Sequence, residues 1–474
     1  MERIFIFSIS TFAILSIVIS IIPFQALGDG FTQENVFASI SNRKLAMFIK
    51  INPPIITSQT QNDRYMYLRF FDANTNQSIN NVSFFMNVTK GDQRLMYDLF
   101  YTKDGSLTIK FLPGAEPGHW QVIGDQEPAL GGWTSQTDIV NVEAPILSEG
   151  GLFHFNMSLL GIDYPNTLLP TGVSVKFNSY LSVGDFYNTT INYNSIPYKI
   201  THVSYYDKIS SSNFDPSKLQ FSWSMPFDWD PVRYKDRPIL VHEEVRVPNS
   251  FAEFTNAPTF SATLNGVPMQ NDKVVLDTVS IPDTTIVHLF VFNDTILDIA
   301  NKMDQKSKTM DFTLSPSKTN VTTSTNMFTD FGQLGVRLGW SPQELEPFSQ
   351  NKLGLTFFDQ SDGKQVTSDV NYDFKITSSK GATIVSMKNL MAKGGTDVVP
   401  LTLPSNGIYR IQVNVTSLVA GDFSDVTRNG VARGNLVIPS VAGQVVIPEF
   451  PLTMPVLLIG IVSVITFYKI KFRK

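Results

Sequence analysis

Apolar and polar residues alternate with a period of two in two stretches that lie far apart in the chain. The apolar positions are Val82, Phe84, Met86 and Val88 in the first stretch, and Val370, Tyr372, Phe374 and Ile376 in the second. Side chains of a strand point alternately to its two faces, so this pattern is typical of half-buried strands in a sheet. Phe85 is the one exception to the alternation.

Similar segments flank both stretches. Phe-Phe-Asp precedes each stretch, ending at Asp72 and Asp359, and a polar turn follows each Asp. Trp120 lies 48 residues after Asp72 and Tyr409 lies 50 residues after Asp359, each in a Gly-x-aromatic segment. The matched spacing predicts two copies of one β-sandwich domain, in which Trp120 is equivalent to Tyr409. The predicted copies span residues 29–148 and 346–440.

Residues 149–345 fit neither copy and lack long amphipathic helices, and Gly and Pro punctuate their apolar runs. The predicted strands cover residues 152–159, 172–177, 218–224, 239–247 and 285–292, and residues 296–303 predict a short helix. We expect one or two domains in this middle region. The predicted fold class is all-β, with several immunoglobulin-like β-sandwich domains in series plus one C-terminal transmembrane helix.

Apolar runs also occupy both ends of the chain. Residues 1–28 predict a signal peptide with an apolar centre and small residues before the cleavage point, and an uncleaved signal anchor is the alternative. Residues 451–468 would form a helix about 27 Å long, enough for a bilayer core. The basic tail, 469–474, predicts a cytoplasmic C-terminus because positive residues stay inside. We therefore expect a single-pass cell-membrane protein that is mostly extracellular, with residues 441–450 as a linker.

The C-terminal segment resembles the sorting segments of surface proteins of ammonia-oxidising archaea. In those proteins Pro-Glu-Phe-Gly precedes an apolar helix and a basic end, and here the residues are Pro448, Glu449, Phe450 and Pro451. Pro451 stands where the family has Gly, which leaves open whether a sorting enzyme cuts the chain or the helix stays. The resemblance covers under thirty residues.

The two copies resemble the carboxypeptidase-regulatory-like, prealbumin-type sandwiches of many surface proteins. Such domains read Asp-x-x-Thr-Gly, then an aliphatic residue, an alternating strand and a closing Gly-x-Tyr. Asp72 and Thr75 fit this pattern, whereas Asn76 replaces the Gly. The resemblance implies a spacer or binding module and no particular ligand.

Composition narrows the class of protein. Charged residues make up 17% of the chain and aromatic residues 12%, which suits packed cores and excludes a disordered stalk. The net charge is −5 with no basic block outside the tail, so nucleic acid is not an expected partner. Cys is absent, so the fold depends on packing without disulfides, and thiol chemistry is excluded.

One block carries candidate metal ligands. His242 and Glu244 would share one face of a strand, and Asp228 or Asp230 from a preceding loop could complete a set of N and O ligands. The alternative is an exposed sheet edge on which His242 is hydrogen-bonded and both Glu243 and Glu244 are solvated, without activity. The other histidines are isolated and predicted to be structural: His119, His154, His202 and His288.

Two further groups of residues have both a possible binding role and a structural one. Trp133, Trp223, Trp229 and Trp340 could form a stacking platform for sugars, although Trp is commoner in cores. The residues after Asp72 copy the start of a calcium loop but lack its Gly and its bidentate Glu, so a turn explains them better. No Gly-x-Ser-x-Gly segment and no phosphate loop occurs.

Eight Asn-x-Ser/Thr sequons are glycosylation candidates: Asn76, Asn81, Asn87, Asn156, Asn188, Asn293, Asn320 and Asn414. The sequence thus predicts a non-catalytic, membrane-anchored surface protein with a structural, adhesion or scaffold role and no cofactor. Its expected partners are the membrane, through residues 451–468, and other surface proteins or glycans. The alternatives are an extracellular metal-dependent enzyme or metal-handling protein, and a solute or glycan receptor.

Overall fold

The structure is a computed structural model that describes most of residues 31–438. The gaps within that range are Ser58, Gln61, Ala115, Pro117, 232–238, Val279, 304–306, Asn320, 331–333, 343–344, 361–362, 421–422 and 426–427. The predicted signal peptide, linker, transmembrane helix and basic tail lie outside the described residues. Within the described part of the chain, no helix is long and apolar enough to cross a membrane.

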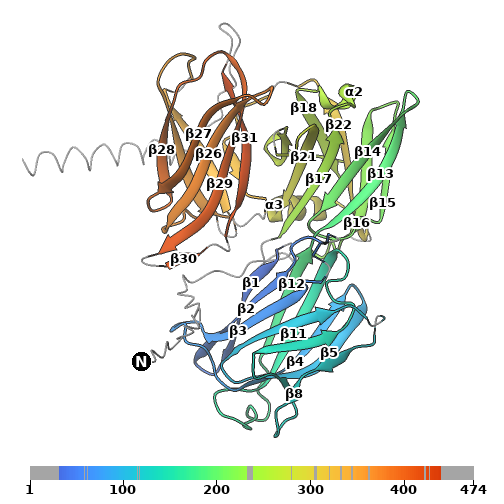
Figure 1. Cartoon of the computed structure of the whole chain (residues 1–474), viewed down its shortest axis with the longest axis vertical. Coiled ribbons are helices and arrows are strands. Elements are labelled where there is room, and N and C mark those ends of the chain that lie inside the picture. Colours follow the sequence, from blue (N-terminus) through green and yellow to red (C-terminus); the bar gives the residue numbers. More distant parts are fainter. Residues whose placement is uncertain are drawn as a thin grey trace, which may run out of the picture.

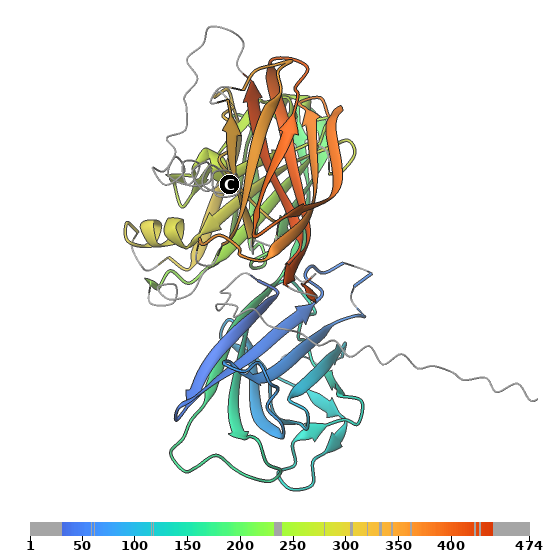
Figure 2. The same cartoon turned by 90° about the vertical axis from the view of Figure 1, so that its left-hand side faces the viewer.

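The described chain is mostly β-strand, and its six sheets pair face to face into three β-sandwiches, which confirms the all-β prediction. Figures 1 and 2 show the first sandwich at the bottom, with the other two above it. Each sandwich has its own core of buried apolar residues. We call the three units the first, middle and last sandwich.

The first sandwich packs a sheet of order β1-β2-β3-β6-β10-β7 on one of order β12-β11-β4-β5-β9-β8. Its strands are β1 Gln33–Ile40, β2 Arg43–Asn52, β3 Tyr65–Asp72, β4 Val82–Lys90, β5 Gln93–Thr102, β6 Ser106–Leu112, β7 Gln121–Ile123, β8 Asp125–Gln126, β9 Trp133–Thr134, β10 Ile139–Glu143, β11 Gly151–Gly161 and β12 Lys176–Val183.

The middle sandwich packs a sheet of order β13-β14-β17-β21-β20 on one of order β15-β16-β22-β18-β19. Its elements are β13 Asp185–Tyr193, β14 Ile196–Ser204, β15 Ser211–Asp215, β16 Gln220–Pro226, β17 Leu240–Pro248, α2 Ala252–Thr255, β18 Thr259–Leu264, β19 Val267–Pro268, η1 Asn271–Lys273, β20 Val274–Asp277, β21 Thr284–Phe292, α3 Asn293–Ala300 and β22 Thr309–Ser317. One core joins its two sheets. The helix α3 overlaps the helix predicted at residues 296–303 and begins three residues earlier.

The last sandwich packs a sheet of order β23-β24-β25-β28 on one in which β27, β26, β29 and β30 follow each other and β31 also pairs with β29. Its strands are β23 Asn326–Phe328, β24 Leu334–Ser341, β25 Asn351–Asp359, β26 Asp369–Ser378, β27 Thr383–Ala392, β28 Thr396–Leu401, β29 Gly407–Ala420, β30 Phe423–Asp425 and β31 Gly430–Ile438.

The first and last sandwiches share one topology of eight strands. The run β1-β2-β3-β6 has the neighbour order of β23-β24-β25-β28, and β12-β11-β4-β5 has that of β31-β29-β26-β27. The shared set places β11 and β12 in the first sandwich and β23 and β24 in the last one. Strand pairing therefore crosses the predicted boundaries at residues 148 and 345, and the sandwiches meet near residues 184 and 320 instead.

Asp72 and Asp359 occupy the same position in the two copies. The backbone N–H of Asp72 donates to Gln77 O at 2.8 Å, and that of Asp359 donates to Lys364 O at 2.8 Å. In both copies the residue four positions after the Asp donates back to the Asp carbonyl at 2.8 Å. The polar turns predicted from the repeat thus have the same hydrogen bonds.

Trp120 and Tyr409 are not equivalent, so this part of the repeat prediction is wrong. Trp120 precedes β7, which pairs with β10 in the β3 sheet, whereas Tyr409 lies in β29 beside β26. The strand that matches β29 is β11, because β7 to β10 are an insertion in the first copy. The two rings also bond differently: Trp120 Nε1 donates to Asp98, and the Tyr409 hydroxyl donates to Ser405 O.

A glycine directly before β6, and another directly before β28, packs against the residue that follows each polar turn. Gly105 and Gly395 have φ of +76° and +74°, and their carbonyls accept the N–H of Phe70 and Phe357. A Cβ on Gly105 would collide with the Ile79 carbonyl oxygen, and one on Gly395 with the equivalent carbonyl oxygen in the last sandwich. Only glycine suits these two positions.

We expect Gly105→Ala and Gly395→Ala each to lower the free energy of unfolding by about 2 kcal/mol or more, since left-handed strain and a backbone collision add. Gly363→Ala is the matched control, because its φ is +67° and nothing lies within 4 Å of its Cβ. Urea denaturation of the full chain measures all three variants. Equal losses in the three would contradict the role of the collision.

Candidate functional site

The polar residues predicted as metal ligands lie at the junction between the middle and last sandwiches. β17 is an inner strand of its sheet, between β14 and β21, and the last sandwich packs against the outer face of that sheet at β17, β21 and β20. One apolar cluster within this contact, which we call the apolar rim, brings together Phe31, Leu240, Val275, Phe290, Phe292, Phe328 and Phe358. His242, Glu244 and His288 are 1%, 5% and 2% exposed inside this contact, and we call them the junction cluster.

Strand register assembles the junction cluster. His242 and Glu244 alternate with Val241, Glu243 and Val245, so the first two point outward and the other three point into the middle core. Glu244 stands directly opposite His288 in the antiparallel pairing of β17 with β21. Opposite and diagonal neighbours of such a pair come within side-chain reach.

The two imidazoles and the carboxylate face one another closely. His242 Nε2 lies 3.1 Å from His288 Nδ1, and Glu244 Oε1 lies 3.5 Å from His288 Nδ1 and 3.9 Å from His242 Nε2. On its other side, His242 Nδ1 donates to the Asp330 carbonyl at 2.8 Å, a contact that reaches into the last sandwich. The rings of Tyr205 and Phe290 stack on His242.

Glu244 has polar partners at both oxygens. Arg246 donates to its Oε2 from Nε and Nη2 at 2.8 and 2.6 Å, and the Tyr205 hydroxyl donates to Oε1 at 3.0 Å. Burial opposes ionisation of Glu244, yet His288, His242 and Arg246 outweigh it and lower its pKa to about 2. Burial also lowers the pKa of His242 to about 3, which keeps this imidazole neutral.

Arg433 of β31 connects the sandwiches through ion pairs. Its Nε lies 2.7 Å from Asp277 Oδ2 of β20, its Nη1 pairs with Asp330, and its Nη2 donates to Ser280 at 3.1 Å. Asp277 also faces the cluster, with Oδ2 3.8 Å from His288 Nε2. Burial disfavours the charged form of Asp277, but His288 and Arg433 outweigh it and lower its pKa.

Glu243 lies on the opposite face of β17, inside the middle core. Ser204 donates to its Oε1 at 2.6 Å and Trp223 Nε1 donates to its Oε2 at 3.3 Å. Burial raises the pKa of Glu243 well above its usual range. A protonated carboxyl held by two donors is the form that such a core accepts.

The predicted ligand set is therefore corrected in two respects. Asp228 and Asp230 are exposed and are not part of the cluster, whose third member is His288. The expectation of an exposed sheet edge with both Glu residues solvated is wrong, because the last sandwich buries the outer face of β17 and the middle core buries Glu243. The sequence feature that could have indicated His288 is that it is the one polar residue in the apolar run of residues 287–292.

The tryptophans do not form a common platform. Trp223 and Trp229 are 2% and 1% exposed in the middle core, whereas Trp133 and Trp340 pack against the cores of the first and last sandwiches. The core interpretation of these residues is confirmed, and the sugar-stacking alternative is wrong.

The sequons differ in accessibility. Asn188 is exposed on β13, and the other described sequon residues are partly buried, while Asn320 lies outside the described residues. Asn81 uses its side chain internally, since Nδ2 donates to Asp163 O at 3.1 Å and Oδ1 accepts from the Tyr101 hydroxyl at 2.7 Å. Asn188 is thus the most accessible candidate for a glycan among the described sequons.

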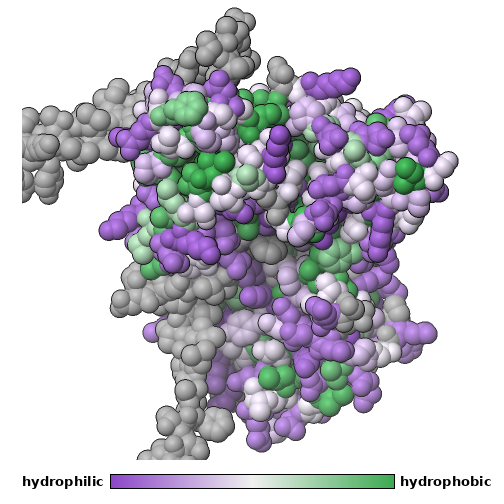
Figure 3. Space-filling view, turned by 45° about the horizontal axis from the view of Figure 1, so that its top comes forward, coloured by the Kyte–Doolittle hydropathy of each residue, from purple (hydrophilic) through white to green (hydrophobic). Residues whose placement is uncertain are grey.

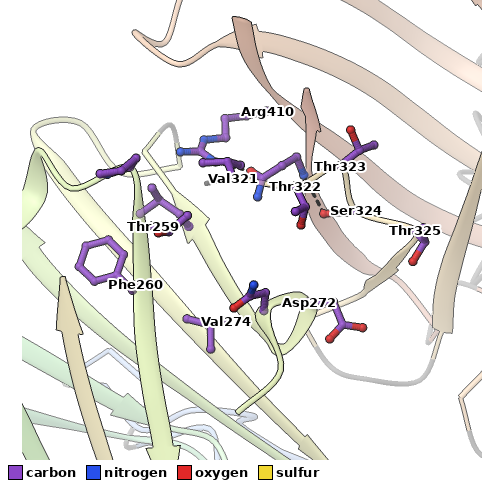
Figure 4. A pocket seen from close by; sticks show the side chains of 14 residues that line it. Thr259, Phe260, Asp272, Val274, Val321, Thr322, Thr323, Ser324, Thr325 and Arg410 are labelled. Carbon is purple, nitrogen blue, oxygen red and sulfur yellow. Dashed lines mark hydrogen bonds between the residues drawn. The ribbon is translucent and has the colours of Figure 1, made fainter. Parts of the chain in front are cut away.

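A cleft of about 250 Å³ with a mixed polar and apolar lining opens between the middle and last sandwiches (Figure 4). Hydroxyl side chains line much of it, namely Thr259, Thr322, Thr323, Ser324 and Thr325. Arg410 of β29 borders the cleft and is 6% exposed, and its Nη1 bonds Asn435. Its Nε has no hydrogen-bond partner among the described residues, and burial lowers the pKa of its guanidinium to about 10.

Comparisons with known proteins do not assign a family. No protein-family model matches the chain, and no curated protein matches it. Among solved structures, a polysaccharide lyase aligns over 85% of this chain and 47% of its own, with 8% identity and a TM-score of 0.17. Dimeric latent PorU from Porphyromonas gingivalis aligns over 78% of this chain and 31% of its own, with 8% identity and a TM-score of 0.14. The chain thus spans less than half of either protein, and the low TM-scores support no functional argument.

We expect Arg433→Leu to lower the free energy of unfolding by about 3 kcal/mol or more, because it leaves Asp277 buried without its cation. The control is Lys302→Ala, which breaks the exposed pair with Asp298 and should change stability by no more than about 0.5 kcal/mol. Urea denaturation of the full chain measures both. A loss as small for Arg433→Leu as for the control would show that the junction pair is dispensable.

His202 predicts a pH dependence. It is 1% exposed among Tyr187, Phe221 and Trp223, and burial lowers its pKa to about 4. The unfolded chain takes up the proton near pH 6.5 and the folded chain only near pH 4, so this residue removes stability as pH falls between those values.

We expect His202→Phe to abolish that loss. From pH 7 to pH 4, the free energy of unfolding of the wild type should therefore fall by about 3 kcal/mol more than that of the variant. Urea denaturation at several pH values measures the difference. A difference that stays constant with pH would contradict a buried, neutral His202.

Proposed function

We propose that this chain is a non-catalytic, membrane-anchored cell-surface protein with a scaffold role, which holds three sandwiches in a fixed arrangement outside the cell. Residues 451–468 would anchor it, as in the archaeal surface proteins that the C-terminal segment resembles. The observation that supports the proposal best is the buried junction between the middle and last sandwiches. Buried ion pairs that cross a contact, as Arg433 does with Asp277, favour one orientation of its two sides.

Contacts with the first sandwich extend the same arrangement. Glu149, next to β11, pairs with Lys90 of the first sandwich and with Lys208 of the middle one, each at 2.7 Å. Phe31, next to β1, packs into the apolar rim of the junction. The face shown in Figure 3 is largely hydrophilic, with hydrophobic side chains scattered in small groups, as befits a surface that stays in water.

The shared topology supports a modular surface protein whose outer copies are prealbumin-type or immunoglobulin-like sandwiches. The Tyr409 hydroxyl donates to Ser405 O at 2.7 Å, four residues upstream, a contact similar to the tyrosine corner of immunoglobulin-like domains. Modules of this kind serve as spacers and as presenting frames, which suits a chain that relies on packing without disulfides.

Protease treatment of intact cells tests the topology and the rigidity together. We expect brief digestion to release the bulk of residues 29–449 as one resistant fragment and to leave a short basic stub in the membrane. Mass spectrometry of the released and retained peptides identifies the cut sites. Protection of residues 29–449 in intact cells would refute the surface location, and rapid cutting into three separate sandwiches would refute the fixed arrangement.

A second candidate function is a receptor for small anionic solutes, and the cleft beside Arg410 favours it. Hydroxyl groups and a buried guanidinium suit a hydroxylated carboxylate, such as an acidic monosaccharide, bound at the Arg410 side of the cleft and away from the Asp272 carboxylate that also lines it. We expect titration calorimetry with galacturonate to show binding that Arg410→Gln weakens about tenfold or more, and that neutral galactose does not reproduce. Equal heats for both sugars, or none, would contradict this function.

A further inference from the structure

We propose that His242, Glu244 and His288 form a binding site for a divalent transition metal of the zinc class, which stabilises the junction between the middle and last sandwiches. This inference goes beyond the scaffold role and does not depend on it. The first argument is geometric. The facing atoms Nε2 of His242, Nδ1 of His288 and Oε1 of Glu244 lie 3.1, 3.5 and 3.9 Å from one another. Ligands bound about 2.0–2.2 Å from a tetrahedral zinc ion lie roughly 3.3–3.6 Å apart, so little movement is needed.

Each proposed ligand also has an outer partner that fixes its orientation. His242 Nδ1 donates to the Asp330 carbonyl, which leaves the lone pair of Nε2 for a metal. His288 Nε2 faces the Asp277 carboxylate, so its Nδ1 is the atom that points to the cluster. Histidines that bind metals commonly place their second nitrogen against a carbonyl or a carboxylate.

The protons of the two imidazoles give a second argument. Because a carbonyl only accepts hydrogen bonds, a neutral His242 carries its proton on Nδ1, and Nε2 is then an acceptor. With its Nδ1 bound to a metal, a neutral His288 carries its proton on Nε2, the atom that faces the Asp277 carboxylate. The outer partners of both rings are thus compatible with a metal bound between Nε2 of His242 and Nδ1 of His288.

Charge supports a cation at this place. The carboxylates of Glu244, Asp277 and Asp330 gather around the cluster and pair with the guanidinium groups of Arg246 and Arg433. Two imidazole nitrogens and one carboxylate oxygen suit zinc better than calcium or magnesium, which prefer oxygen ligands.

Burial indicates what such an ion does. The three ligands come from β17 and β21 of the middle sandwich, whereas Asp330 and Arg433 around them belong to the last one. A bound ion would therefore order the outer face of the middle sheet in the form that the last sandwich packs against. With all three ligands at most 5% exposed, this is a structural metal that enters as the junction forms.

Metal binding by the purified full-length chain tests the proposal. We expect protein stripped by a chelator and dialysed against micromolar zinc to retain about one zinc per chain by mass spectrometry, and its melting temperature to rise with zinc. His288→Gln and Glu244→Gln should lower the zinc affinity at least about tenfold. His202→Phe is the matched control, because it replaces a buried histidine of the same sandwich outside the cluster, and it should retain the ion.

Cobalt binding to the wild-type chain keeps the test decisive if a variant fails to fold. We expect Co²⁺ to give the intense visible absorption of a tetrahedral site, in which a water molecule joins the three protein ligands, and zinc to displace it. A wild-type chain that retains no zinc and shows no such band would overturn the proposal. Zinc that remains equally bound in folded His288→Gln and Glu244→Gln would place the ion elsewhere and overturn it as well.

Discussion

The arrangement of the chain depends on one constraint, which is that the outer face of the β17 sheet carries charged side chains and is nevertheless buried. Removing Glu244, Asp277 and Arg433 from water costs several kcal/mol for each ion unless partners replace the lost hydration. The middle sandwich supplies Arg246 and Tyr205, and the last sandwich supplies Arg433 and the Asp330 carbonyl. The two sandwiches therefore complete each other, since neither provides all the partners that this face needs.

Local patterns predicted the strands and the repeat because their causes are local. The alternation in residues 82–88 and 370–376 reflects one buried face, and the turn after Asp72 needs only hydrogen bonds within eight residues. The closing strand could not be matched in this way. A Gly-x-aromatic segment precedes or begins a strand in both copies, but the two strands belong to different sheets. Only the strand pairing shows that β7 to β10 are inserted in the first copy and that β11 is the equivalent of β29.

The candidate site was predicted only in part for a related reason. The period of two predicts that His242 and Glu244 lie on the same face of a strand, and the structure confirms this. The contribution of His288 depends on the register between β17 and β21, which no feature of either strand specifies alone. The burial of Glu244 depends on a sandwich whose first strand starts some eighty residues later. The same alternation of apolar and polar residues occurs whether the polar face of the strand is exposed to solvent or is covered by another domain, so the sequence pattern does not distinguish the two.

Apolar packing and buried charges contribute differently to the junction. The chain has no cysteine, so its contacts are not cross-linked by disulfides. The aromatic rim around Phe290 and Phe328 removes apolar area from water, but such packing accepts small rotations. The contacts of Arg433 do not accept such rotations, because its guanidinium reaches Asp277, Asp330 and Ser280 in one orientation only. We infer that the apolar rim supplies most of the free energy of the contact and that the buried charges select its orientation, which explains why the contact contains a costly polar cluster instead of more phenylalanine.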